Sequence, residues 1–113
     1  MHELSLMEGV LAVLEEERDR HGFRRVVRIV LEIGALAGVE REALAFCHEA
    51  VAAGTVAEGA ALELVDVPAM AWCGVCQADV PVDSRLDLCP HCGEVPVRIT
   101  QGLDLRVKSI EVE

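Results

Sequence analysis

Apolar residues recur at three- and four-residue steps near the start of the chain. The steps join Leu4, Met7, Val10, Leu11 and Leu14. Acidic and basic residues occupy most of the positions between them, so the pattern predicts an amphipathic helix. Gly22 follows a basic last turn and is typical of a residue that ends a helix.

Three later segments alternate apolar with other residues at a period of two, which is typical of β-strands. They cover residues 26–33, 61–67 and 103–112. A second helix is expected between the first two segments, and its apolar stripe carries Leu44, Cys47 and Val51. A strand, a helix and a strand in succession predict a right-handed parallel crossover.

These elements predict an α/β fold in which two helices pack on a small three-stranded mixed sheet. In the last strand the alternation slips around Lys108 and Ser109, which predicts a β-bulge. Residues 68–100 hold all four prolines and four of the five cysteines, so the composition changes there. We therefore predict two domains: an α/β domain of residues 1–67 plus 101–113, and an inserted four-cysteine module of residues 68–100.

The four cysteines form two C-x-x-C pairs separated by twelve residues. The pairs are Cys73 with Cys76 and Cys89 with Cys92. Each turn directs two thiolates to one point, and two such turns complete a tetrahedron suited to zinc, as in a zinc ribbon. Iron also suits thiolate tetrahedra, and unrelated cysteines are the remaining alternative. Because protein sulfur fills every position and leaves none for water, we expect the zinc to be structural.

A histidine and the fifth cysteine could also take part in metal binding or catalysis, but each has a simpler structural interpretation. His91 lies inside the second C-x-x-C turn, where it is either a substitute or supporting ligand or, more commonly, a solvent-facing turn residue. Cys47 lies beside Phe46 on the apolar stripe of the second helix, and we expect it to be a small core residue. No base is placed near Cys47 by the sequence, so a nucleophilic role is unsupported.

The net charge of the chain is −10, with 20 acidic and 10 basic residues. Such a surface repels nucleic acids and acidic membranes and attracts cations, metal ions included. The N-terminus has acidic residues where a signal peptide carries a positive segment, and no uncharged stretch reaches the roughly 20 residues of a membrane span. We therefore expect a cytoplasmic protein whose cysteines stay reduced.

His2 directly follows Met1, and this position has its own metal chemistry. The terminal amine, the deprotonated amide nitrogen of His2 and its imidazole can close chelate rings around one ion, and such planar nitrogen donors suit nickel(II) or copper(II). Glu3 adds an amide nitrogen and a carboxylate. A histidine at position 2 is more often part of a frayed terminus, and spacing alone does not decide between the two. Helical periodicity that begins at Leu4 favours an ordered terminus.

Several of these features together resemble the HypA/HybF family of hydrogenase maturation factors. The resemblance spans nearly the whole chain. Its motifs are the opening Met1-His2-Glu3-Leu4-Ser5-Leu6, the strand end Ile33-Gly34, Gly59-Ala60 before Leu62, the four-cysteine pattern, Thr100-Gln101-Gly102 and the closing Lys108-Ser109-Ile110-Glu111-Val112. The opening Met-His-Glu with two spaced C-x-x-C pairs is the specific part.

The resemblance implies a small nickel metallochaperone with a structural zinc module. It implies that His2 and the adjacent backbone nitrogens, including the amine of Met1, bind nickel in the α/β domain and that Glu3 supports them. The implied cargo is nickel, and the implied partners are a HypB-type GTPase that handles nickel and the hydrogenase large subunit. Some relatives carry histidines where this chain has Gln77 and Gly93.

The resemblance also places one further acidic residue of some relatives at Glu40. We keep an alternative from another class, a zinc-ribbon adaptor for nucleic acid or the transcription machinery, which the net charge disfavours. A zinc or thiol enzyme lacks an open metal position, so we expect no catalytic activity. The basic cluster of Arg24, Arg25 and Arg28 is either a solvated strand edge or a docking point for an acidic partner. We expect a monomer or weak homodimer.

Overall fold

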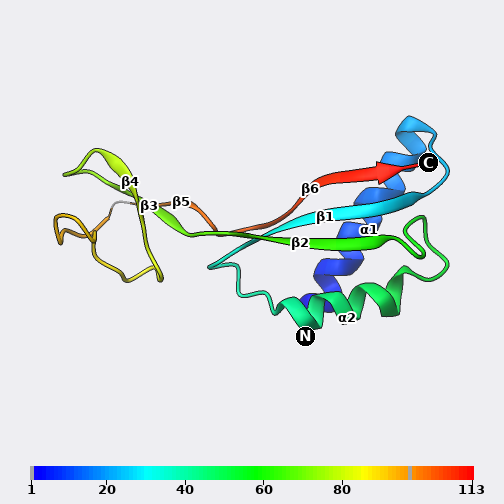
Figure 1. The fold of residues 1–113 in the computed structure, drawn as a ribbon, viewed down its shortest axis with the longest axis horizontal. Helices are drawn as coiled ribbons and strands as arrows, with labels where there is room; N and C mark the ends of the chain where they lie inside the picture. The colour runs from blue at the N-terminus through cyan, green and yellow to red at the C-terminus, as the bar shows by residue number, and fades with distance from the viewer. Residues whose placement is uncertain (1, 97) are drawn as a thin grey trace. The chain divides into compact units, whose positions relative to one another are not determined.

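A computed structural model describes residues 2–96 and 98–113 of the chain (Figure 1). Helix α1 spans His2–His21, and Met7, Val10, Leu11 and Leu14 are buried on one face of it, as their spacing predicts. The buried stripe of α1 does not begin at Leu4, where the apolar periodicity begins in the sequence. Leu4 is 43% exposed, and Glu3 is buried in its place, because Glu3 is one helical turn before Met7 and so lies on the same stripe.

The first sheet has the strand order β2-β1-β6 (Figure 1). Its strands are β1 Val26–Gly34, β2 Ala61–Val67 and β6 Leu105–Val112. Strands β1 and β2 run in the same direction. At the start of β1, Val26 N–H donates to the carbonyl oxygen of Val56 in the segment that precedes β2, and directly after β1, Ala35 N–H donates to that of Val67, the last residue of β2. Strand β6 runs the opposite way. Arg25 bonds to Glu113, and Gly34 N–H donates to Asp104. The predicted mixed three-stranded sheet with a parallel crossover is therefore confirmed.

Helix α2 spans Arg41–Ala52 and packs against α1. Aliphatic residues dominate the core of this part of the chain, and among its largest buried side chains are Met7, Leu14, Val26, Ile29, Leu31 and Leu44. The predicted buried stripe of α2 is partly wrong. Leu44, His48 and Ala52 are buried, whereas Cys47 is only half-buried and Phe46 is 72% exposed. The stripe follows steps of four residues, which turn His48 inward in place of Cys47.

A second sheet has the order β4-β3-β5. Its strands are β3 Met70–Cys73, β4 Ala78–Pro81 and β5 Arg98–Gln101. Strand β3 pairs antiparallel with both neighbours, and its register shifts between Met70 and Ala71 beside β5. Two small clusters are buried around it. One holds Ala69, Ala71 and Val82, with Leu36 and Ile99 packed against them, and the other holds Val80 with Cys73 and Cys89. So small a core leaves this sheet dependent on another source of stability.

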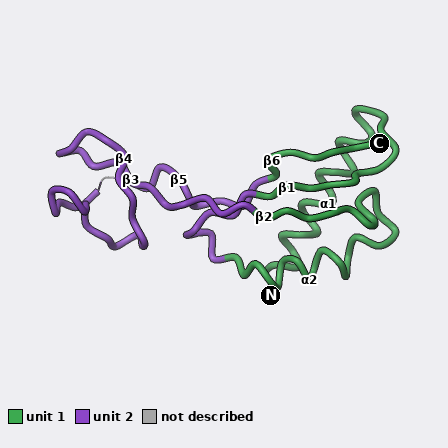
Figure 2. The backbone as a smooth tube through the Cα atoms, in the orientation of Figure 1, with its two compact units in different colours: residues 1–31, 39–64, 107–113 green, residues 32–38, 65–106 purple. Residues whose placement is uncertain are grey.

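The chain divides into two compact units, which Figure 2 colours separately. Unit 1 holds residues 1–31, 39–64 and 107–113, and unit 2 holds residues 32–38 and 65–106. The domain boundaries expected from composition, at residues 68 and 100, stay a prediction. Within the described part of the chain, no helix combines the length and the hydropathy that crossing a bilayer requires.

Two glycines of unit 2 lie against each other, and both belong to motifs that carried the family resemblance. A Cβ added to Gly34 would collide with the carbonyl group of Gly102. A Cβ added to Gly102 would lie 2.7 Å from the Cα of Ala69, and the φ of Gly102 is +93°. Only a residue without a side chain fits at either position.

Replacing Gly34 with alanine should lower the free energy of unfolding by about 2–3 kcal/mol, because backbone must move to admit the methyl group. Gly9 is the matched control. It lies inside α1, and a Cβ added there would meet no atom within 4 Å, so Gly9→Ala should raise stability by about 1 kcal/mol. Urea unfolding followed by circular dichroism measures both changes. Equal effects of the two substitutions would contradict the close approach of Gly34 and Gly102.

Candidate metal centres

The first C-x-x-C turn of unit 2 forms the connection of the β3–β4 hairpin, and the second lies against it. Cys73 is the last residue of β3, and Cys76 lies in the turn that leads to β4. Cys89 and Cys92 form a second turn, in which the carbonyl group of Cys89 accepts from the N–H of Gly93 at 2.9 Å. The residue after each pair has a positive φ, 51° at Gln77 and 79° at Gly93. Both turns therefore place a residue of left-handed conformation directly after the second cysteine.

The four Sγ atoms all lie within 4.8 Å of one another. The separation is 3.5 Å between Cys73 and Cys92 and 3.9 Å between Cys76 and Cys89. A zinc ion with four thiolates at about 2.3 Å requires sulfur atoms about 3.8 Å apart, and disulfides would bring them to about 2 Å. The spacing therefore fits one tetrahedral zinc ion. No other group of three or more potential ligands gathers in this way among the described residues.

The four thiols hold their protons with unequal strength. Hydrogen bonds, first of all to Cys92, and burial raise the pKa of Cys76 to about 12, so its thiol holds its proton. The backbone N–H of Cys92, first among several donors, lowers the pKa of Cys89 to about 6. Four thiolates this close repel one another, and a bound dication removes that repulsion. The donor set is closed, so it fits a structural zinc ion. His91 is exposed and outside the ligand group.

The candidate nickel site begins at the first turn of α1. The side chain of His2 is 54% exposed, whereas that of Glu3 is 8% exposed. A distance of 3.7 Å separates His2 Nε2 from Glu3 Oε2. Met1, to which the sequence assigns the amine ligand, lies outside the described residues. The structure thus places an accessible imidazole beside a buried carboxylate at the start of the helix.

Glu3 joins this turn to the start of α2. Its Oε2 accepts from the backbone N–H of Glu40 at 3.1 Å. Glu40 is the N-cap residue of α2 and makes no capping bond with its own side chain, so Glu3 supplies the cap from another helix. This bond, first among the causes, lowers the pKa of Glu3 to about 2. The carboxylate therefore stays ionised and holds the first turn of α1 in place.

The contact joins two acidic residues to which the family resemblance gives a role, and their part in nickel binding stays a prediction. Glu40 was assigned by resemblance, and the structure brings its main chain to Glu3 while its side chain is exposed. The sequence analysis did not predict that Glu3 is buried, although its position four residues before Met7 indicated it.

The basic cluster of the sequence analysis forms ion pairs with acidic residues of the same chain. Arg24 and Arg25 pair with Glu113, and Arg28 pairs with Glu63.

The depressed pKa of Glu3 predicts a pH-dependent contribution to stability. Because the folded state binds the proton of Glu3 more weakly than the unfolded state does, the contribution is present above about pH 4.5 and disappears as pH falls towards 2. Glu3→Gln should therefore destabilise the protein at pH 7 and have much less effect near pH 2.5. Urea unfolding at both pH values measures this difference. The exposed Glu8→Gln is the control, and the same loss at both pH values for Glu3→Gln would contradict the assignment.

Comparison with known proteins identifies the family. Residues 1–112 match the family model described as hydrogenase/urease nickel incorporation, metallochaperone, hypA. The chain belongs to the HypA family. It is 51% identical to the hydrogenase maturation factor HypA of Azotobacter chroococcum mcd 1 and 50% identical to that of Azotobacter vinelandii, over all 113 residues and the full length of both relatives.

Solved structures agree with membership of the HypA family. The solution structure of the Ni metallochaperone HypA from Helicobacter pylori aligns with a TM-score of 0.75 at 25% identity, over 99% of this chain and 97% of that chain. A solution structure of HypA protein aligns with a TM-score of 0.77 at 25% identity, over 100% and 97%. The predicted fold class is confirmed, and the predicted function, a nickel metallochaperone of hydrogenase maturation, is confirmed at the level of the family.

Proposed function

We propose that this HypA-family protein carries Ni(II) on the first turn of α1, with the imidazole and amide nitrogen of His2 and the amine of Met1 as ligands. The observation that carries the proposal is the contact of Glu3 with the N-terminus of α2. It anchors the residue next to His2 and leaves the imidazole of His2 accessible. A carrier needs both properties, because it must hold the ion and also release it.

Helix geometry supports the amide nitrogen of His2 as a ligand. The N–H groups of the first helical turn have no acceptor four residues earlier, so the amide of His2 can lose its proton without breaking a helical hydrogen bond. The positive end of the helix dipole disfavours a cation there. The ionised carboxylate of Glu3, 3.7 Å from the imidazole, offsets that effect. Glu3 thus supports the site electrostatically.

The proposed delivery route follows from family and charge. We infer that the nickel passes to the large subunit of a [NiFe] hydrogenase, with the help of a HypB-type GTPase, in the cytoplasm. The net charge of −10 attracts the free cation and basic partner surfaces. The protein has no catalytic role in this account. The zinc ion is structural, since sulfur fills its four positions.

An N-terminal extension tests the proposal. Adding Gly-Ser before Met1 moves the free amine away from His2, so nickel affinity should fall by a factor of about 100 or more when one chelate ring is lost. Calorimetric titration with Ni(II) measures it. The control is the same dipeptide added after Glu113, which should leave the affinity unchanged. Equal nickel affinity of the two extended proteins would show that the amine of Met1 is not a ligand.

A further inference from the structure

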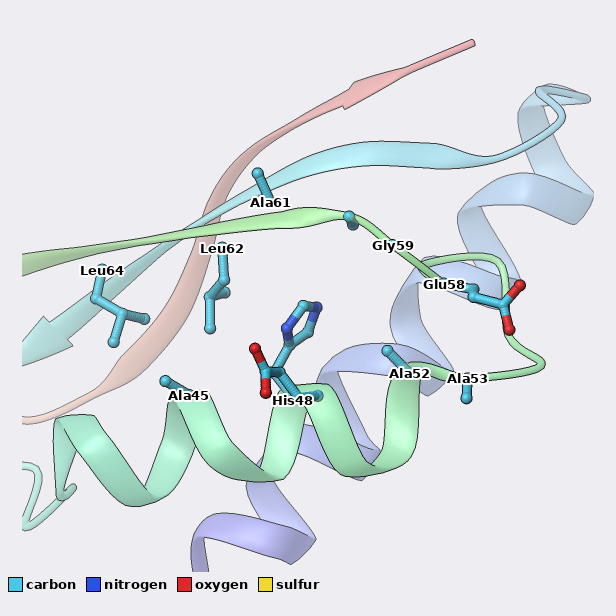
Figure 3. Close-up of a pocket in the computed structure, with 11 residues that line it drawn as sticks. Ala45, His48, Ala52, Ala53, Glu58, Gly59, Ala61, Leu62 and Leu64 are labelled. Atoms are coloured by element: carbon cyan, nitrogen blue, oxygen red, sulfur yellow. The ribbon is translucent and has the colours of Figure 1, made fainter.

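A cavity of about 530 Å³ lies between α2 and the start of β2, within unit 1 (Figure 3). Most of its lining is small or aliphatic, including Ala45 and Ala52 of α2 and Leu62 and Leu64 of β2. The small side chains of α2 leave the space open, since the helix carries alanine where larger residues would reach β2. The cavity is wide enough for one long side chain with an apolar stem.

His48 is the polar group of this cavity. It is 6% exposed, and Figure 3 shows its imidazole projecting from α2 towards β2. Its Nε2 is buried and makes no hydrogen bond to any residue that the structure describes. Burial lowers the pKa of His48, which favours the neutral ring. In the neutral tautomer that carries its proton on Nδ1, Nε2 is a hydrogen-bond acceptor. An acceptor left without a donor costs stability, and an occupant that carries N–H groups would supply the missing bond.

Two carboxylates complete the lining. Glu49 follows His48 on α2, and its charge acts on the imidazole. Glu58 is held in the turn before β2 by the N–H of Gly54 at 2.9 Å. Both side chains belong to residues at the surface. Acids beside an apolar cavity favour an occupant that is apolar along its stem and cationic at its tip.

The chain already shows that a guanidinium fits between these two elements. Arg41 of α2 donates from its side chain to the carbonyl oxygen of Leu64 in β2, at 3.4 Å. Strand β2 is also an edge strand of its sheet. A partner segment that runs along this edge can place a side chain over the cavity. A metal ion is not indicated, because the ligand atoms of His48 and the two acids do not gather in one group.

We propose that this cavity binds an arginine side chain of a partner protein, whose stem packs on Ala45, Ala52 and Leu62 and whose guanidinium donates to His48 Nε2 and Glu49. The recognition is independent of the nickel site. It gives the protein a specific contact for a basic segment, beyond the general attraction of its negative charge.

The test uses N-acetyl-arginine N-methylamide as the probe and the matching citrulline compound as the control of equal shape without charge. Titration of the zinc-loaded protein is followed by ¹H–¹⁵N NMR. We expect saturable binding of the arginine probe, shifts confined to residues 45–64, and a change of the His48 Nε2 resonance. The citrulline compound should bind about tenfold more weakly. Equal binding of both probes, or no binding of either, would overturn the proposal.

Two variants locate the binding. Glu49→Gln should weaken the arginine probe about fivefold, whereas Glu16→Gln, an exposed acid of α1 with the same loss of charge, should not. Ala45→Leu should fill the cavity and abolish the shifts. Its thermal transition shows whether it still folds. Should it fail to fold, the comparison of Glu49→Gln with Glu16→Gln decides, and equal weakening in both would show that only the overall charge attracts the probe.

Discussion

Replacing Cys73 with serine should release the zinc ion and unfold residues 68–98, while the sheet of β2, β1 and β6 remains. Cys73 is completely buried, and its Sγ atom lies 3.5 Å from that of Cys92. The Cys73→Ser protein keeps only three of the four thiolates that form the ligand group. Metal binding by a structural thiolate site contributes on the order of 10 kcal/mol to folding, and the small core around Ala71 cannot replace it.

Zinc analysis measures the loss of the ion, and the ¹H–¹⁵N NMR spectrum shows which residues unfold. The fifth cysteine offers a matched control, because Cys47 is half-buried in α2 and outside the group of ligand atoms. Cys47→Ser should keep one zinc ion per chain and cost only about 1 kcal/mol or less of stability. Full zinc occupancy in the Cys73→Ser protein would show that the four cysteines do not form the site.

His2→Ala should abolish tight nickel binding and lower hydrogenase activity in cells by about tenfold or more, with partial recovery when excess nickel is supplied. The substitution removes the imidazole of His2. Because this side chain is 54% exposed and contributes little to packing, zinc content and thermal stability should be unchanged. Activity in a strain that depends on this protein, measured with and without added nickel, checks the expectation.

The control for His2 is the histidine at the other end of the same helix. His21 is exposed and lies 3.1 Å from Glu17, so His21→Ala removes the same ring without touching the first turn. It should leave hydrogenase activity unchanged. An equal loss of activity in both variants would mean that α1, rather than the nickel ligand, is what the cell requires.

Much of the fold was predictable because local patterns determine it. The period of each strand, the period of α1 and the spacing of the cysteines act over a few residues, so the sequence alone carries them. The zinc ligands were predictable for the same reason, since each C-x-x-C turn brings two sulfur atoms to one point.

Contacts between distant residues were not predictable in this way. The hydrogen bond from Glu40 to Glu3 joins positions 37 residues apart. Through it, Glu3 in the buried stripe of α1 caps the N-terminus of α2. The approach of Gly34 to Gly102 likewise depends on the order of strands in the sheet. In α2, Leu44 fits steps of three or four residues equally well, so periodicity did not decide whether Cys47 or His48 turns inward.

Calorimetric titration of the zinc-loaded protein with Ni(II), in wild type, His2→Ala and His21→Ala, tests whether His2 binds the nickel. All three proteins need a native N-terminus and no added histidines. One tight nickel ion per chain is expected for wild type and His21→Ala, and none for His2→Ala. Unchanged nickel affinity in the His2→Ala protein would contradict the claim that the first turn of α1 carries the nickel.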